Sequence, residues 1–131
     1  MEMDASKTLK DLSVTTVRSI RQPVASLSGG QRQSVAVAKA VLFDAKLVIM
    51  DEPTAALGVA QTRMVLDLIK RLASRGVAVM VVSHNLNDVF EIADRITVLY
   101  LGRSVASGPA TDFDRQSAVE YMTTGAATRA A

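Results

Sequence analysis

Residues 47–54 read Leu-Val-Ile-Met-Asp-Glu-Pro-Thr, and this stretch decides the fold. Its four consecutive apolar residues suit a parallel strand that is buried on both faces. The strand ends in two carboxylates, Asp51 and Glu52, and Pro53 breaks the run. Ligands of layered α/β folds bind beyond the carboxyl ends of the strands, so the two acids are candidates for a functional site. A strand end with solvated acids is the plainer alternative.

Helices and buried strands alternate on both sides of this stretch. Apolar residues recur at helical spacing over residues 28–43 and 59–75, with Ser28 as an expected N-cap and Gly76 as an expected C′ residue. Residues 77–82 predict a second buried strand. The remaining expected elements are a short helix within residues 5–12, an extended stretch over 15–26, a helix over 86–93, a strand pair over 95–107, a helix over 116–123 and a frayed tail over 125–131. This order predicts an α/β layered fold with a mostly parallel sheet.

Composition excludes several classes of function. The 131 residues include no Cys, no Trp and one His, which argues against a disulfide scaffold, a zinc finger and a base-stacking platform. The net charge is +2 and the basic residues are dispersed, so nucleic acid is not an expected partner. The longest apolar run, residues 77–82, is far short of the roughly 20 residues of a membrane span. We therefore expect a cytoplasmic protein without direct membrane insertion.

A second candidate site lies at residues 27–31, Leu-Ser-Gly-Gly-Gln. Gly29 and Gly30 let the backbone approach a ligand closely, and N–H groups at a helix start favour a phosphate. The Ser28 hydroxyl and Gln31 add polar groups to the same turn. The alternative is an ordinary helix cap with a flexible entry.

His84 is the third candidate, directly after the strand over residues 77–82. Adjacent parallel strands would bring it to the same sheet edge as Asp51 and Glu52. Asp51 would there hold Mg²⁺ through water, and Glu52 would orient or deprotonate a water. His84 would contact a γ-phosphate or position the attacking water, although a lone His is more often structural.

In combination, these segments resemble the ATP-binding cassette (ABC) ATPases. Residues 27–33 look like the signature motif of that family, residues 47–54 like its Walker B segment with the catalytic glutamate, and residues 83–85 like its switch-histidine segment. The resemblance covers roughly residues 25–110. It implies a P-loop NTPase-like fold, present here as the C-terminal half of an ABC ATPase domain.

The same resemblance implies a division of the chain and a role for each site residue. Residues 1–45 would be a remnant of the helical subdomain, residues 46–110 the Walker B and switch-histidine core, and residues 111–131 a C-terminal helix and tail. Residues 28–31 would bind the γ-phosphate of an ATP held by the other domain of a head-to-tail dimer. Asp51 would help to hold Mg²⁺, Glu52 would polarise the attacking water, and His84 would bridge that water and the γ-phosphate.

The sequence departs from the family pattern in two places. Gly58 stands where the D-loop normally carries an Asp, a carboxylate that would couple the two nucleotide sites. The surrounding residues 52–61 look like those of sugar-import cassettes, particularly those for monosaccharides. No Gly-x-x-x-x-Gly-Lys-[Ser/Thr] phosphate loop occurs in the 131 residues, so we expect weak or no ATP binding by this chain alone.

The resemblance therefore implies part of the ATP-binding and hydrolysing subunit of a sugar importer. ATP and Mg²⁺ would be its cofactors, and a second nucleotide-binding domain (in a homo- or heterodimer) and membrane permease subunits its partners. It would sit at the inner face of the cell membrane through the permease. One alternative is a truncated, non-catalytic protein that docks a full-length cassette or permease. A chromosome-maintenance or repair ATPase is disfavoured because no long heptad pattern flanks the signature segment.

Without the first half of the family's domain, one edge and one apolar face of the sheet should be uncovered. Such surfaces promote association between chains. We therefore expect self-association unless a partner covers them.

Overall fold

The computed structural model describes residues 2–11 and 19–127. The chain forms two compact units, residues 1–84 and residues 85–131. Part of the expected extended stretch (residues 15–18) and part of the expected tail (residues 128–131) lie outside the described residues. No helix in the described part of the chain is long and apolar enough to cross a membrane.

The first unit alternates helices with two strands, in the order that the sequence predicts. Its elements are α1 (Glu2–Asp11), the 3₁₀ turn η1 (Val24–Ser26), α2 (Gly29–Leu42), β1 (Leu47–Asp51), α3 (Val59–Ser74) and β2 (Ala78–Val82). Ser28 is the N-cap of α2, as expected. Gly76 follows α3 with a φ of 84°, a left-handed conformation that glycine adopts at little cost. The sequence therefore predicts both ends of the central helices closely.

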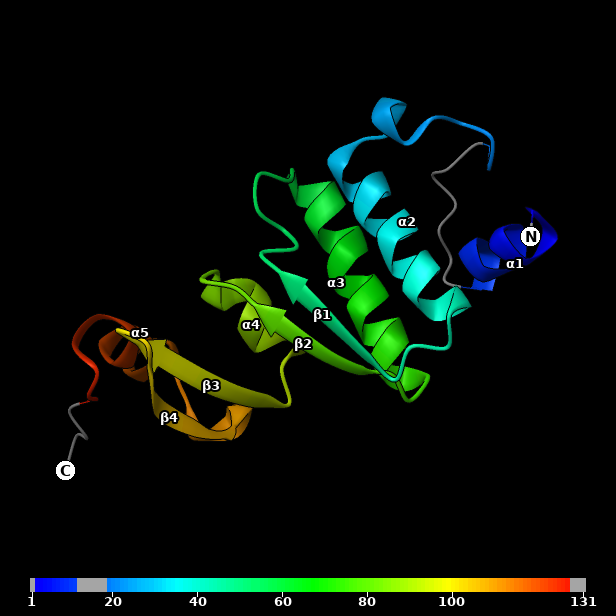
Figure 1. Ribbon diagram of the computed structural model, residues 1–131. Helices are drawn as coiled ribbons and strands as arrows, with labels where there is room; N and C mark the ends of the chain where they lie inside the picture. Colours follow the sequence, from blue (N-terminus) through cyan, green and yellow to red (C-terminus); the bar gives the residue numbers. More distant parts are fainter. Residues whose placement is uncertain (1, 12–18, 128–131) are drawn as a thin grey trace. The chain divides into compact units, whose positions relative to one another are not determined.

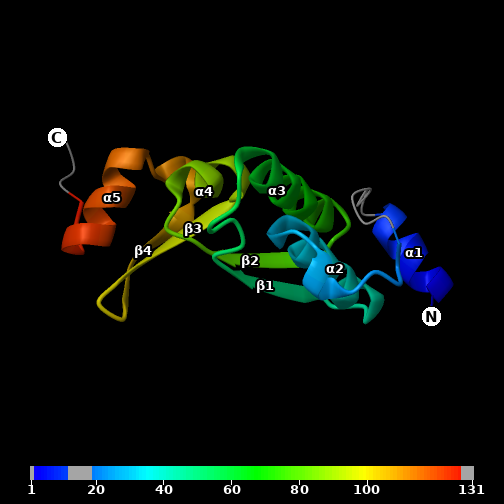
Figure 2. The same cartoon turned by 90° about the horizontal axis from the view of Figure 1, so that it is seen from above.

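Strands β1 and β2 form a parallel pair whose register joins Leu47 to Ala78 and Asp51 to Val82. Figures 1 and 2 show α2 and α3 side by side on one face of this pair. Helix α3 connects the two strands, so both of them run in the same direction and end at the same edge. The expected α/β layering is confirmed, and the residues that follow β1 and β2 are neighbours in space.

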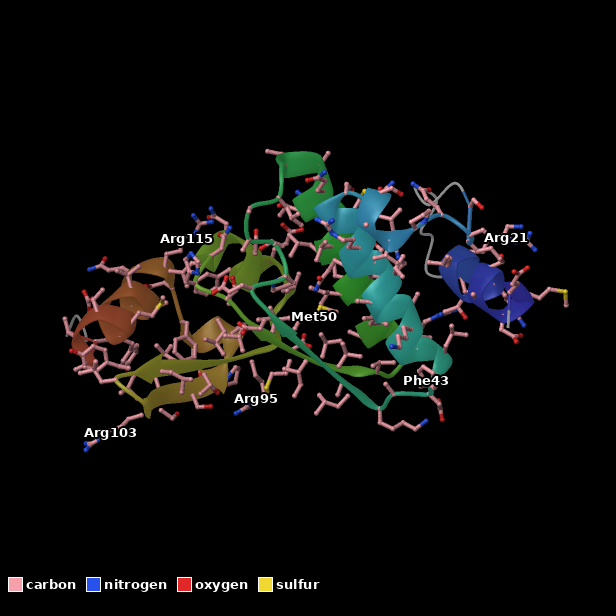
Figure 3. All side chains as sticks on the ribbon, turned by 45° about the horizontal axis from the view of Figure 1, so that its top comes forward. Arg21, Phe43, Met50, Arg95, Arg103 and Arg115 are labelled. Atoms are coloured by element: carbon pink, nitrogen blue, oxygen red, sulfur yellow. The ribbon has the colours of Figure 1, made fainter. Side chains whose placement is uncertain are left out.

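The core of this unit lies between the helices and the strands. Helix α3 buries one continuous apolar stripe, at the helical spacing that the sequence predicts, formed by Val65, Leu66, Leu68, Ile69 and Leu72. Val48 and Met50 of β1 are buried opposite it, and Figure 3 labels Met50 between β1 and α2. A fully buried aliphatic side chain contributes roughly 1.5–3 kcal/mol, so burial of this stripe stabilises the unit.

The other face of the strand pair is bare. The prediction that β1 is buried on both faces is therefore wrong, and so is the prediction of β2 as a second buried strand. Ile49 and Met80 leave 63% and 54% of their surface exposed, and Leu47 and Val82 also lie open. Side chains alternate between the two faces of a strand, and among the described residues α2 and α3 cover only one of them. The uncovered apolar face that the resemblance implies is therefore present.

The second unit is a hairpin with helices. Its elements are α4 (Leu86–Ile92), β3 (Arg95–Tyr100), β4 (Arg103–Pro109), the 3₁₀ turn η2 (Ala110–Asp112) and α5 (Arg115–Thr124). The two strands are antiparallel, which confirms the expected pair. Leu101 and Gly102 form its two-residue turn with φ values of 46° and 75°. Positive φ at both central positions is the turn geometry that matches the twist of a hairpin.

Helix α5 has a defined cap at each end. The carboxylate of Asp114 accepts the Ser117 N–H at 2.7 Å, and the Ser117 hydroxyl lies 3.0 Å from the Asp114 N–H in return. The hydrogen bonds from the Ser117 backbone and then from its side chain lower the pKa of Asp114. At the other end Gly125 is left-handed, and a Cβ there would lie 2.7 Å from the Tyr100 ring.

Candidate functional site

The carboxyl edge of the β1–β2 pair gathers the acidic and imidazole side chains that the sequence singles out. Glu52 follows β1, and its N–H donates to the carbonyl of Val82 at 2.8 Å, which extends the strand pairing by one bond. Glu52 itself is left-handed, with a φ of 46°. That conformation costs a residue with a Cβ of the order of 1–3 kcal/mol, so the surrounding contacts must hold it. The turn leaves the Glu52 side chain within reach of His84.

Glu52 and His84 form a close pair through one carboxylate oxygen. Glu52 Oε1 lies 2.8 Å from His84 Nδ1 and also accepts the His84 N–H at 3.2 Å. A carboxylate has no proton to offer, so Nδ1 carries the hydrogen and Nε2 is the acceptor in the neutral ring. The Glu52 side chain is 35% exposed and the His84 side chain 78%. The expectation that these residues lie at one edge of the sheet is confirmed, and both side chains are accessible to solvent.

Asp51 lies beside this pair, at the last position of β1, with its side chain exposed. The described residues contain no group of three or more His, Cys, Asp or Glu side chains that could hold a metal ion. Mg²⁺ commonly binds proteins through one or two carboxylates and takes its other ligands from water and substrate phosphates. A single open carboxylate at this edge fits such a ligand set, so Asp51 suits Mg²⁺ only together with a phosphate group.

The start of α2 is a polar turn closed by reciprocal hydrogen bonds. The Ser28 N–H donates to Gln31 Oε1 at 2.9 Å, and the Gln31 N–H donates to Ser28 Oγ at 3.3 Å. This is a capping box, and it holds the turn without using the N–H groups of Gly29 and Gly30. Those two N–H groups lie in the first helical turn, where no carbonyl of the helix can accept from them. The arrangement is typical of an anion-binding helix start.

Two further residues contact this turn, and the sequence interpretation missed both. A Cβ on Gly29 would lie 2.8 Å from Cδ2 of Leu57, and a Cβ on Gly30 would lie 3.3 Å from Cβ of Gln61. The glycines therefore permit close packing of α2 against the start of α3, in addition to any approach to a ligand. Gln61 was detectable in principle, because it stands three residues after Gly58, the spacing of a capping interaction.

The loop between Glu52 and α3 is held by its own backbone and by Gln61. The Ala55 N–H donates to the Glu52 carbonyl at 3.1 Å, and the Leu57 N–H donates to the Thr54 carbonyl at 3.2 Å. At the end of the loop the Gly58 N–H donates to Gln61 Oε1 at 3.2 Å. Gly58 brings no carboxylate to this position, so the loop is fixed by turns and a cap.

Solved structures share this fold. The chain matches an ABC transporter in an inward-facing conformation with a TM-score of 0.78 and 30% identity, over 92% of this chain and 47% of that one. It matches the dimeric structure of MJ0796, a bacterial ABC transporter cassette, with a TM-score of 0.67 and 29% identity, over 82% of this chain and 46% of that one. The fold class is that of the ABC ATPase cassettes.

Sequence comparisons give the same family. The model of the family described as ABC transporter matches residues 1–55. The fructose import ATP-binding protein FrcA of Rhizobium meliloti is 49% identical over 123 residues, which are 94% of this chain and 47% of that protein. The xylose/arabinose import ATP-binding protein XylG of Sulfolobus acidocaldarius is 43% identical over 121 residues, which are 92% of this chain and 48% of that protein.

The chain thus spans about half the length of the curated relatives it matches. It corresponds to the C-terminal part of ATP-binding proteins of ABC transporters, and the relatives reported above are named for sugar import.

Proposed function

We propose that this chain is part of the ATP-binding subunit of a sugar importer. It provides the anion-binding turn at residues 28–31 and the residues for hydrolysis, Glu52 and His84, at the carboxyl edge of the β1–β2 pair. The observation that carries the proposal is the pair at the carboxyl edge, in which one oxygen of Glu52 holds both the backbone and the ring of His84. The sugar class rests on relatives named for the import of fructose and of xylose or arabinose.

The hydrolytic role follows from which atoms of Glu52 and His84 are engaged with each other and which remain available to water and phosphate. Oε1 of Glu52 is engaged by His84, so Oε2 is the oxygen left to accept a hydrogen bond from an attacking water. The ring of His84 is held with Nε2 away from Glu52, where it can contact that water or the γ-phosphate. Catalysis of this kind is positioning and electrostatics, because phosphoryl transfer asks for little covalent chemistry from the protein.

The phosphate-binding role belongs to the start of α2. The N–H groups of Gly29 and Gly30, with the Ser28 hydroxyl, would receive the γ-phosphate of an ATP held by a second nucleotide-binding domain. Gln31 would act with them. Mg²⁺, when bound, neutralises charge on the phosphate oxygens, and Asp51 would hold it through water.

The expected partners are a second nucleotide-binding domain and the permease subunits, with the chain at the inner face of the cell membrane. The dimeric form of the similar cassette MJ0796 supports the first of these partners. We expect neither nucleic acid binding nor direct membrane insertion.

A second candidate is a non-catalytic protein that docks a full-length cassette or a permease. The exposed apolar face around Ile49 and Met80 favours this candidate, because a contiguous exposed apolar surface is typical of a protein–protein interaction site. Docking alone requires neither the Glu52–His84 pair nor the turn at Ser28.

Complementation in trans separates the two candidates. A full-length sugar-import cassette with an inactivated signature motif is mixed with this chain, and ATP hydrolysis is measured. We expect the chain to restore hydrolysis, and Ser28→Arg to abolish the effect, because a bulky cation replaces the hydroxyl of the anion-binding turn. Ala25→Arg, at an exposed position just upstream, serves as the control for added charge. Association without restored hydrolysis would favour the docking protein.

A further inference from the structure

The two functional segments of the first unit are in direct contact, although each was identified separately in the sequence. The Gly29 position approaches Leu57, the last residue before Gly58, and the Gly30 position approaches Gln61 in the first turn of α3. Figures 1 and 2 show α2 and α3 lying alongside each other. The anion-binding turn and the loop that follows Glu52 therefore share one packed interface.

Gln61 is the residue that joins the two sides of this interface. Its Oε1 accepts the Gly58 N–H at 3.2 Å and so ties the end of the loop to α3. A Cβ built on Gly30 would lie 3.3 Å from the Gln61 Cβ, so the close approach of the two helices at this point depends on the glycine. Gly30 is buried and Gln61 is half-buried, so the two residues can separate only if the interface between α2 and α3 opens.

The same device recurs one helix away. Gln31 accepts the Ser28 N–H at 2.9 Å just as Gln61 accepts the Gly58 N–H, and each glutamine is the third residue of its helix. The difference lies at the N-cap, because Ser28 returns a hydrogen bond through its hydroxyl and Gly58 has no side chain to do so. The start of α3 therefore depends on the side chain of Gln61 alone for this cap.

We propose that Gln61 is a positioning residue that holds the anion-binding turn and the Glu52 loop as one body. Through Oε1 it fixes the loop, and through Cβ it seats Gly30, so the N–H groups of Gly29 and Gly30 keep a constant place relative to Glu52. Leu57, beneath Gly29, adds the second point of contact. The consequence for ATP hydrolysis rests on the proposed function, whereas the mechanical link stands on these contacts.

Amide hydrogen exchange in the whole chain tests the link. Gln61→Leu keeps Cβ and Cγ but removes the acceptor, so we expect exchange at Gly58 to rise together with exchange at Gln31 and Arg32, whose N–H groups donate to Ser28 in the first turn of α2. A rise of about threefold to tenfold corresponds to the loss of one hydrogen bond. Gln61→Glu keeps an acceptor at the same position and should restore slow exchange at all three amides. Gln116→Leu, at an exposed glutamine near the start of α5, is the matched control and should change none of them.

The outcomes are distinct. Faster exchange at Gly58 with unchanged exchange at Gln31 and Arg32 would show that Gln61 only caps α3, and the proposal would be overturned. Failure of Gln61→Glu to restore slow exchange at Gln31 and Arg32 would overturn it as well. In the trans hydrolysis assay, Gln61→Leu should lower the restored rate and Gln61→Glu should recover it. If the unmodified chain restores no hydrolysis, the proposed function fails, and the exchange rates alone still decide whether Gln61 links the two segments.

Discussion

One oxygen of Glu52 serves two groups of His84: it lies 2.8 Å from Nδ1 and accepts the backbone N–H at 3.2 Å. The two residues follow parallel strands that end side by side, with Asp51 opposite Val82 in the register. A single acceptor thereby sets both the course of the chain at His84 and the orientation of its ring. The state of that ring is the first property to measure.

Glu52 should fix the tautomer of the neutral His84 ring, with hydrogen on Nδ1, because the carboxylate oxygen can only accept. Long-range proton–nitrogen correlation spectra at a pH where the ring is neutral report the tautomer directly. In Glu52→Gln the side chain can donate as well as accept, so we expect a mixture that includes hydrogen on Nε2. Asp51→Asn is the control, since the contacts of His84 are with Glu52. An Nε2-protonated ring in the unmodified protein would contradict the assigned hydrogen bond.

Gly29 and Leu57 should be energetically coupled. Gly29→Ala places a Cβ 2.8 Å from Leu57 Cδ2, and Leu57→Ala removes that atom. We expect Gly29→Ala to cost less in the Leu57→Ala background, with a coupling energy of about 1 kcal/mol in a urea-unfolding cycle. Gly102→Ala has open space around it and should be additive with Leu57→Ala. Additive costs for Gly29→Ala would mean that Leu57 simply moves aside.

Two left-handed glycines in the second unit separate backbone strain from a steric clash. Gly102 (φ 75°) and Gly125 (φ 77°) have nearly the same φ, but a Cβ meets nothing within 4 Å at Gly102 and lies 2.7 Å from the Tyr100 ring at Gly125. Gly102→Ala should therefore cost only the left-handed penalty, about 1–2 kcal/mol. Gly125→Ala should cost more, as measured by the free energy of unfolding. Equal costs would show that the Tyr100 ring yields freely.

The cap at Asp114 should make α5 sensitive to acid. The bonds from Ser117 lower the pKa of Asp114, so the carboxylate is favoured in the folded state. The cap contributes fully above the ordinary pKa of an unfolded Asp, about 3.9, and its contribution is lost as the pH falls through the lower folded value. Amide exchange in α5 between neutral and acidic pH measures this loss. Asp114→Asn keeps an acceptor that does not titrate and should flatten the dependence; an unchanged profile would assign it to another group.

The bare strand face should drive association of the isolated chain. Ile49 and Met80 stand on adjacent strands with more than half of their surface exposed, at 63% and 54%. We expect sedimentation to show concentration-dependent association, and Ile49→Lys with Met80→Lys to reduce it, because two charges cannot be buried cheaply in an apolar contact. Val59→Lys, the control, adds one charge at an exposed apolar position outside the strands and should leave association unchanged. A monomer at every concentration would show that the face is tolerated in water.

Local signals in the sequence predict most of the first unit. Ser28 and Gly76 mark a helix start and a helix end because their caps depend on nearest neighbours along the chain. The meeting of Glu52 with His84 was predictable as well, since parallel strands of equal length end at one edge. What the continuous apolar run at residues 47–50 cannot tell is how many faces are covered, because that depends on which elements pack there.

The sequence by itself determined the family, the order of elements and the residues at the strand ends. Only the tertiary structure decided that Glu52 is left-handed and that Ile49 faces open space. It also decided that Gly30 packs on Gln61. Caps and periodicities are encoded within a few residues, so they can be read locally. The close approach of Gly30 to Gln61 is possible because Gly30 has no Cβ. Which residue lies next to Gly30 depends on how α2 and α3 pack, and this packing cannot be read from neighbouring residues in the sequence.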